Sequence, residues 1–251
     1  MRARLRFSKL GKLRFLSHRD LARLWERTLR RADVAVAYSE GFSPRPRLHF
    51  GLALSTGHES LGEYLDIDLA PNADVAVADL PGRVNALLPI GITAEAAVPV
   101  DPGTPSLQQA VTACTWQLEL AGVAPEEAAA AVDRVLAADA LPIRVERKGA
   151  GVDLDARPSI VTLELAGPPG PPPDVATLRQ GTVLVAELAT QPRSLRPAEL
   201  VRALDPSWVE SRVLRTHQWT LIDGARREPI PLPEGGARGA QSIPHAGARA
   251  S

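Results

Sequence analysis

Residues 2–31 read RARLRFSKLGKLRFLSHRDLARLWERTLRR, and this stretch holds the two periodicities that set the fold. At its start, Arg2, Arg4 and Arg6 alternate with apolar residues, which predicts a strand with one charged and one apolar face. Ser17 is a typical N-cap residue, and Leu21, Leu24, Trp25 and Leu29 follow it at helical spacing. We expect a strand over residues 2–7, a turn at Gly11-Lys12, an extended segment over 13–16 and a helix over about 18–31.

The elements expected after this helix complete an α+β unit. Short strands are predicted at 34–38, 47–54 and 62–69, a helix at about 74–88, which Pro81-Gly82 should kink or split, and a strand at 92–100. A proline-bounded loop, residues 38–46, interrupts the order. Strand, helix, strand, strand, helix, strand is the ferredoxin-like βαββαβ arrangement.

The same order recurs in the second half of the chain. Strands are expected at 113–121, 142–147, 159–165 and 182–188, with helices at 125–138 and at about 194–204 and a final strand or hairpin at 208–223. The sequence therefore predicts two tandem ferredoxin-like domains, residues 1–100 and 105–223. Residues 224–251 are rich in Gly, Ala, Arg and Pro, have little to bury, and are expected to form a disordered tail.

The charges are balanced in total but unevenly distributed. The chain has 29 basic and 29 acidic residues, yet residues 1–50 carry thirteen basic and four acidic side chains, whereas residues 51–140 carry two and thirteen. This asymmetry indicates a charged partner surface, docking between the two segments, or both.

Several classes of protein are not expected. No apolar run has the roughly 18 to 20 residues of a membrane helix, and the N-terminus lacks the apolar stretch of a signal peptide. A single cysteine, Cys114, cannot form an internal disulfide and cannot alone hold zinc or an iron–sulfur cluster. We expect a cytoplasmic protein that holds no metal and no cofactor of its own.

The basic N-terminal segment predicts a nucleic-acid contact surface. Arginine side chains on one face of a strand and along the polar side of a helix can bind phosphates, and aromatic residues in the neighbouring loop can stack on unpaired bases. The expected contacts are Arg4, Arg6, Lys9, Lys12, Arg14, His18, Arg19, Arg45 and Arg47, with Tyr38 and Phe42 shaping the loop. An ordinary solvated face, or docking against the acidic segment or a protein partner, would give the same pattern.

No catalytic residues are predicted from the motifs. Ser17 and Asp20 form an acidic variant of a capping box, which explains both residues without chemistry. As an alternative, His18, His49 and Tyr38 could perform metal-independent RNA cleavage, in which one imidazole removes the 2′-hydroxyl proton and another protonates the leaving oxygen.

Three segments, residues 6–20, 27–32 and 38–46, together resemble the stand-alone form of the radical SAM-linked domain-of-unknown-function family of bacteria. Ala35, where that family pattern has proline, is a departure that weakens the turn expected after the helix. The resemblance implies an accessory role beside a B12-binding radical SAM protein, in a setting of ribosome- or RNA-processing genes. It supplies no catalytic residues. The tandem architecture also resembles that of CRISPR repeat-processing RNA endonucleases, at the level of fold only.

These observations give one leading hypothesis and two alternatives. The leading hypothesis is a non-catalytic module that binds RNA or a ribosome-related particle and acts with a radical SAM enzyme. The first alternative is a protein–protein adaptor that docks on the radical SAM partner. The second is a metal-independent ribonuclease.

Overall fold

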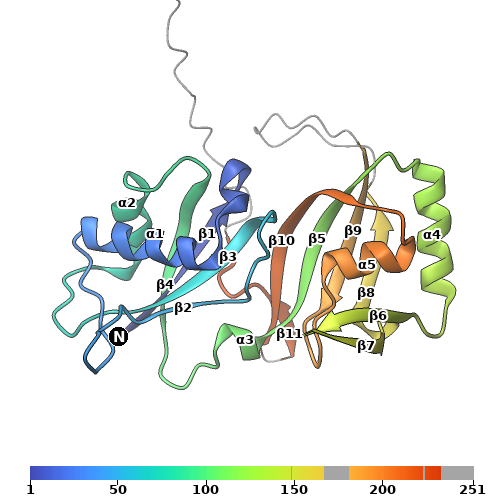
Figure 1. Ribbon diagram of the computed structural model, residues 1–251. Helices are drawn as coiled ribbons and strands as arrows, with labels where there is room; N and C mark the ends of the chain where they lie inside the picture. Colours follow the sequence, from blue (N-terminus) through green and yellow to red (C-terminus); the bar gives the residue numbers. More distant parts are fainter. Residues whose placement is uncertain (148, 167–180, 223, 233–251) are drawn as a thin grey trace, which may run out of the picture.

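A computed structural model describes residues 1–147, 149–166, 181–222 and 224–232, and these residues form a nine-stranded mixed sheet, a separate two-stranded hairpin and several helices. The sheet has two halves, which lie side by side with β3 and β10 adjacent in the middle (Figure 1). The α+β class expected from the sequence is confirmed.

The N-terminal half is built on β1, a central strand. Its elements are β1 (Arg2–Lys9), the 3-10 helix η1 (Gly11–Phe15), α1 (His18–Arg31), β2 (Leu48–Phe50), β3 (Glu59–Asp68), the 3-10 helix η2 (Val77–Asp79), α2 (Leu80–Asn85) and β4 (Ile92–Val100). β1 lies between β4 and β3, β2 pairs with β3, and all three pairings are antiparallel.

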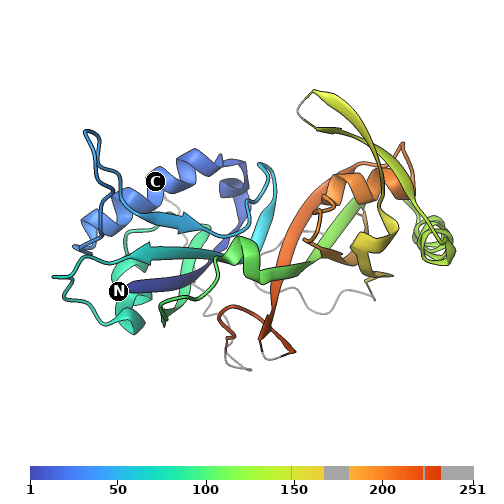
Figure 2. The same cartoon turned by 90° about the horizontal axis from the view of Figure 1, so that it is seen from below.

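The second half has a related strand order. Its elements are α3 (Leu107–Ala110), β5 (Val111–Ala121), α4 (Pro125–Ala137), β6 (Pro142–Arg147), β7 (Ala150–Asp155), the 3-10 helix η3 (Arg157–Ser159), β8 (Ile160–Leu165), β9 (Gly181–Ala189), α5 (Pro197–Leu204), β10 (Glu210–Ile222) and β11 (Ala225–Arg227). The strands follow the order β10-β5-β9-β8, again antiparallel, while β6 and β7 form the separate hairpin (Figure 2).

Each half has its own hydrophobic core. In the first half, Ala3, Leu5 and Phe7 of β1 face Leu21, Trp25 and Leu29 of α1, as the two periodicities predict. The Phe7 and Trp25 rings meet edge to face, with centroids 5.0 Å apart. The Ser17 hydroxyl accepts a hydrogen bond from the Asp20 backbone N–H and so caps α1 as expected.

Several elements differ from the sequence prediction. Residues 13–16 do not form an extended segment, because Gly11, at φ 62°, starts a 3-10 helix that ends at Phe15. The strand expected at 34–38 is reduced to isolated bridges at Val36 and Tyr38. The helix expected at 74–88 is only Leu80–Asn85 after a 3-10 turn, because Pro81 favours a helix start rather than an interior. The strand β7 and the short helix α3 were not predicted.

The predicted tail begins too early. Residues 225–227 pair with β10 as β11, Ile230 is buried, and Glu228 forms an ion pair with Arg6 at 2.8 Å. Residues 225–232 are therefore part of the fold, and the rest of the predicted tail, residues 233–251, lies outside the described residues. The division into two tandem domains at residues 100–105 stays a prediction.

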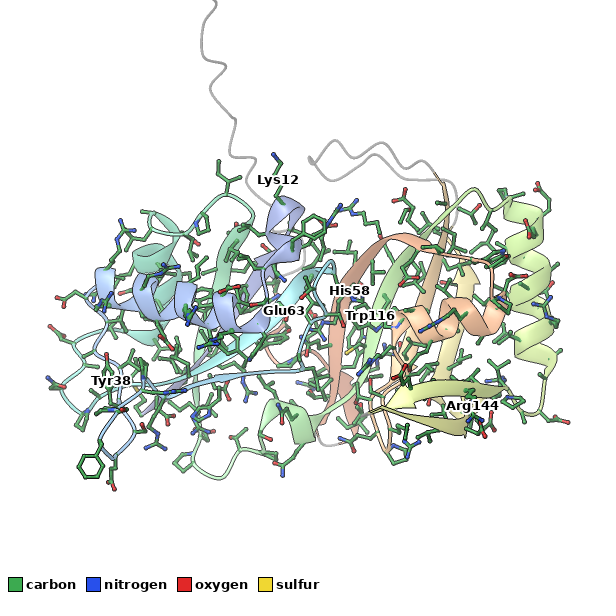
Figure 3. The ribbon with its side chains drawn as sticks, in the orientation of Figure 1. Lys12, Tyr38, His58, Glu63, Trp116 and Arg144 are labelled. Carbon is green, nitrogen blue, oxygen red and sulfur yellow. The ribbon has the colours of Figure 1, made fainter. Side chains whose placement is uncertain are left out.

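The two halves meet at a seam, which we define as the parallel pairing of β3 with β10 through Glu59 with Leu214 and Ser60 with Arg215. Arg215 is 2% exposed there, and its guanidinium donates to Glu63 Oε1 at 2.6 Å and to the Leu52 carbonyl at 2.9 Å. The same guanidinium lies over the Trp116 ring, 5.3 Å from its centroid. Figure 3 shows Glu63 and Trp116 at this junction. The seam is therefore closed by a buried ion pair.

Removing the cation from the seam should destabilise the whole chain. In an Arg215→Met variant, Glu63 keeps a buried charge without its partner, and we expect the free energy of unfolding to fall by about 3 to 5 kcal/mol. Urea denaturation followed by circular dichroism measures this change. The Arg144→Ala variant is the control, because it removes an exposed pair with Asp153 and should cost less than about 1 kcal/mol. Equal stability of the two variants would show that the pair does not hold the seam.

His58 is a half-buried polar residue beside the seam. Its ring packs edge to face against Trp116, and its Nδ1 is buried and, within the ranges given above, has no hydrogen-bond partner. Burial, together with the charges of Arg215 and Lys9, lowers the pKa of His58 from 6.5 to about 4. The folded protein thus holds this imidazole neutral at a pH where the unfolded chain protonates it.

The depressed pKa of His58 predicts a pH-dependent loss of stability. Between about pH 6.5 and 4 the unfolded state binds the additional proton, so the contribution of His58 is complete above pH 6.5 and is lost as the pH falls. Urea midpoints measured from pH 7.5 to 4.5 should therefore fall more steeply for the wild type than for His58→Gln. Parallel curves for the two proteins would contradict this assignment.

Candidate nucleic-acid interface

The charged face of β1 points into ion pairs rather than into solvent. Arg4 is 7% exposed and donates to both oxygens of Asp66, at 2.7 and 2.9 Å. Arg6 is 3% exposed and donates to Glu95 at 2.9 Å. The expectation that these arginines face outward is wrong, because β1 is a central strand and acids of the 51–140 segment lie opposite it. For these residues, docking between the basic and acidic segments accounts for the charge pattern.

Lys9 is also withdrawn from the surface. It is 1% exposed, and its Nζ donates to the backbone carbonyls of Arg14 and Leu16 at 3.2 and 3.1 Å. Burial lowers the pKa of Lys9. The negative charge of Glu63 opposes this shift, and the positive charge of Arg215 adds to it. Lys9 therefore fixes the 3-10 helix η1 to β1 and is not placed to contact a ligand.

The remaining predicted residues fall into separate groups. Lys12 is exposed on η1, and Arg14 lies over the Phe15 ring at 4.8 Å. Figure 3 shows Lys12 and Tyr38 at opposite ends of the N-terminal half, so η1 and the loop that begins at Tyr38 do not share one site.

Helix α1 presents a row of cations to solvent. Arg23 pairs with Asp20 at 3.8 Å across one turn of the helix, and both side chains are more than half exposed. The other exposed arginines of the helix make no ion pair with any described residue: Arg19, Arg27, Arg30 and Arg31. This polar face is the part of the predicted surface that the structure keeps accessible.

Residues 38–47 form a closed loop that projects an aromatic side chain. Tyr38 bridges to Pro46, and the Ser39 and Arg45 backbones are joined by a 2.9 Å hydrogen bond and a second bond to the Ser39 hydroxyl. Gly41, at φ 117°, allows the turn at the tip. Phe42 follows it and is fully exposed, while Tyr38 is 55% exposed. We call α1 from Arg19 to Arg31, together with this loop, the basic-aromatic surface.

One carboxylate organises the cations at the base of the loop. Asp68 Oδ1 accepts from Arg2 Nε at 2.6 Å, and Asp68 Oδ2 lies 2.9 Å from Arg47 Nε and 3.5 Å from His49 Nε2. Burial alone would raise the pKa of Asp68, but the hydrogen bond and charge of Arg2, with His49 and Arg47, outweigh it and lower that pKa. Arg47, which the sequence predicted as a contact, is thus held in place while its side chain stays half exposed.

A cavity of about 390 Å³ lies beside β2, between the first residue of α1 and the segment that enters α3. We call it the β2 cavity. Its lining includes Arg2, His18, His49, Phe50, Leu107 and Gln108. The structure thus brings His18 and His49 to one cavity. It does not bring Tyr38 there, because Tyr38 lines a different cavity beside the end of α1.

Sequence reasoning missed two parts of this site. Asp68 could have been found, since Asp66 and Asp68 alternate with Ile67 on β3 in the same way that the arginines alternate on β1. Leu107 and Gln108 had no local signal, because they reach the β2 cavity from the other side of the predicted linker.

Two further residues are explained by packing. Cys114 is buried, and this burial raises the pKa of its thiol to about 11. His217 stacks on Trp219, with ring centroids 5.0 Å apart. The described residues contain no cluster of three or more His, Cys, Asp or Glu side chains arranged to hold a metal ion. Among the described helices, none has both the length and the apolar character needed to span a membrane.

Comparisons with known proteins place the chain in a family. No curated protein matches it. Among solved structures, a chain of "Crystal Structure of a Cbf5-Nop10-Gar1 Complex" superposes with a TM-score of 0.49 and 7% sequence identity. The match covers 86% of this chain and 48% of that one, so this chain spans about half the length of its structural match. Residues 2–197 match the family described as "Uncharacterized protein conserved in bacteria (DUF2344)", and the chain therefore belongs to the DUF2344 family.

Proposed function

We propose that this DUF2344 protein is a binding module for single-stranded RNA and that the basic-aromatic surface is its contact site. One observation carries the proposal. Once the strand arginines are paired internally, the exposed cations that remain in the first 50 residues lie mainly on α1 and on a loop that also exposes Tyr38 and Phe42. Between residues 19 and 47 there are seven arginines and four acidic residues, so this surface is positive although the chain is neutral.

The chemistry of the surface fits a flexible polyanion with exposed bases. Guanidinium groups donate paired hydrogen bonds to phosphate oxygens, and they do so at any physiological pH. Exposed Phe and Tyr rings give bases a stacking surface, which a duplex with paired bases cannot use. The contacts we assign are Arg19, Arg23, Arg27, Arg45 and Arg47 for phosphates, with Phe42 and Tyr38 for bases.

The setting follows from the resemblance to the radical SAM-linked family. We infer that the module presents RNA, or a ribosome-related particle, to a B12-binding radical SAM protein that performs the chemistry. The strand orders β4-β1-β3-β2 and β10-β5-β9-β8, each antiparallel, support the further inference that both halves are ferredoxin-like units, the second with the β6–β7 hairpin inserted.

RNA binding should depend on salt and on the loop. A fluorescein-labelled oligouridylate of about 12 nucleotides should bind with an affinity that falls steeply between about 50 and 200 mM salt. Phe42→Ala should weaken binding by roughly 5- to 150-fold, the loss of about 1 to 3 kcal/mol for one stacked base. Arg45→Ala should weaken binding and also lower the salt dependence. Fluorescence anisotropy measures all three.

The control is Arg83→Ala, which removes an exposed arginine of α2 that is not part of the basic-aromatic surface. It should bind as the wild type does. Equal RNA binding by Phe42→Ala, Arg45→Ala and the control would exclude the basic-aromatic surface as the RNA contact site. If RNA does not bind at all and a radical SAM partner is captured whether or not ribonuclease is present, the adaptor alternative replaces the proposal.

A second candidate function, metal-independent RNA cleavage, is favoured by one observation. His18 and His49 line the same β2 cavity, where one imidazole could act as base and the other as acid. In this case the wild type should cleave RNA in the presence of EDTA, and His18→Ala and His49→Ala should each reduce the rate by at least about 100-fold. Absence of cleavage, or cleavage equal to that of the variants, rejects these roles.

A further inference from the structure

We infer that the β2 cavity binds one nucleotide, with its phosphate on Arg2 and His49 and its base against the apolar wall formed by Phe50 and Leu107. The inference rests on the proposed function for its ligand class, but it concerns a site that the basic-aromatic surface does not include. The observations that carry it are the charge balance, the size and the two kinds of lining of this cavity.

The charge balance around the cavity favours an anion. Asp66, the acid in its lining, is already neutralised by the two hydrogen bonds from Arg4. Asp68 does not line the cavity and is shared by Arg2 and Arg47. Two carboxylates around the cavity are therefore paired with three guanidiniums, those of Arg2, Arg4 and Arg47, and the imidazoles of His18 and His49 also line it. The Arg2 side chain remains 35% exposed while its Nε is fixed by Asp68, so its position is set before a ligand arrives.

The size of the cavity favours a nucleotide over a smaller anion. Its volume of about 390 Å³ lies near the lower end of the range for small-ligand sites, roughly 300 to 1,000 Å³. A phosphate ion would leave most of this volume empty and the apolar wall uncovered, whereas a base with its ribose would fill it.

The lining supplies a partner for each part of a nucleotide. Phe50 is held in place by the His18 ring, which meets it edge to face with centroids 5.1 Å apart. Leu107 comes from the start of α3, and Gln108 beside it carries an amide that can donate and accept hydrogen bonds. A cationic side and an apolar, planar side therefore lie within one cavity.

The position of the cavity connects it to the basic-aromatic surface. Arg47 ends the loop, directly precedes β2, and shares Asp68 with Arg2 of the cavity. An RNA strand that is bound across the loop can therefore place its next nucleotide in the β2 cavity. The same chemistry would also accept a free mononucleotide, and the experiment separates these two sources.

Isothermal titration calorimetry with uridine 5′-monophosphate and adenosine 5′-monophosphate tests the inference on the full chain. At least one should bind the wild type, and inorganic phosphate should bind at least about tenfold more weakly because it cannot use the apolar wall. His49→Gln should weaken nucleotide binding by about tenfold or more through loss of one charge-assisted hydrogen bond. Ala53→Phe, which fills the cavity from its lining without altering a charge, should abolish binding.

The Arg83→Ala variant should bind nucleotide as the wild type does, and a thermal melt of each variant establishes that it is folded. Absence of nucleotide binding, equal binding of inorganic phosphate, or no effect of either cavity variant overturns the inference. If RNA binds but no mononucleotide does, the β2 cavity is rejected as a nucleotide site and the proposed function stands. If a mononucleotide binds but RNA does not, the proposed function is rejected and the nucleotide site stands. Displacement of the bound mononucleotide by the oligouridylate identifies the RNA strand as the source, and its absence identifies a free nucleotide.

Discussion

The buried pair of Arg215 with Glu63 is the constraint on which the two-part sheet depends. The two halves have largely separate cores, with Tyr64 of β3 packed into the core of the second half, and the backbone pairing that joins β3 to β10 is short. A full ion pair in a site with 2% exposure is stable only if both charges are present and their remaining hydrogen bonds are satisfied. The Arg215 guanidinium has two further contacts, a hydrogen bond to the Leu52 carbonyl and a cation–π contact with the Trp116 ring. The seam therefore fixes one relative placement of the halves, and with it the position of Leu107 beside β2.

The arginines of this neutral chain occupy two different environments. Arginines on the central strand are neutralised one by one by acids far along the chain, as Arg4 is by Asp66 and Arg6 by Glu95. On α1, by contrast, Arg19, Arg27, Arg30 and Arg31 are exposed and have no ion-pair partner among the described residues, and Arg47 of the loop stays half exposed beside Asp68. The same residue type is thus structural on β1 and accessible on α1. Composition alone cannot distinguish the two.

The sequence predicted the parts of the fold that local periodicity determines. β1, α1 and its Ser17 cap were expected within a residue or two, because alternation and helical spacing depend only on neighbours in the chain. The outward orientation of Arg4 and Arg6 was expected wrongly, since it depends on what β3 and β4 present across the sheet. For the candidate site, the loop with Tyr38 and Phe42 followed from its prolines and glycine, whereas the contribution of Gln108 required the tertiary fold.

The contacts of Arg6 with residues 228 and 230 have a consequence for synthesis on the ribosome. Arg6 donates to the Ile230 carbonyl, 224 positions later, and pairs with Glu228. A growing chain that carries only the N-terminal half contains Glu95 and Tyr64 but lacks Glu228 and the Ile230 carbonyl, so the Arg6 guanidinium has to keep water on that side. Burial of Arg6 is therefore complete only once residues 228–230 have been synthesised and have packed against β1.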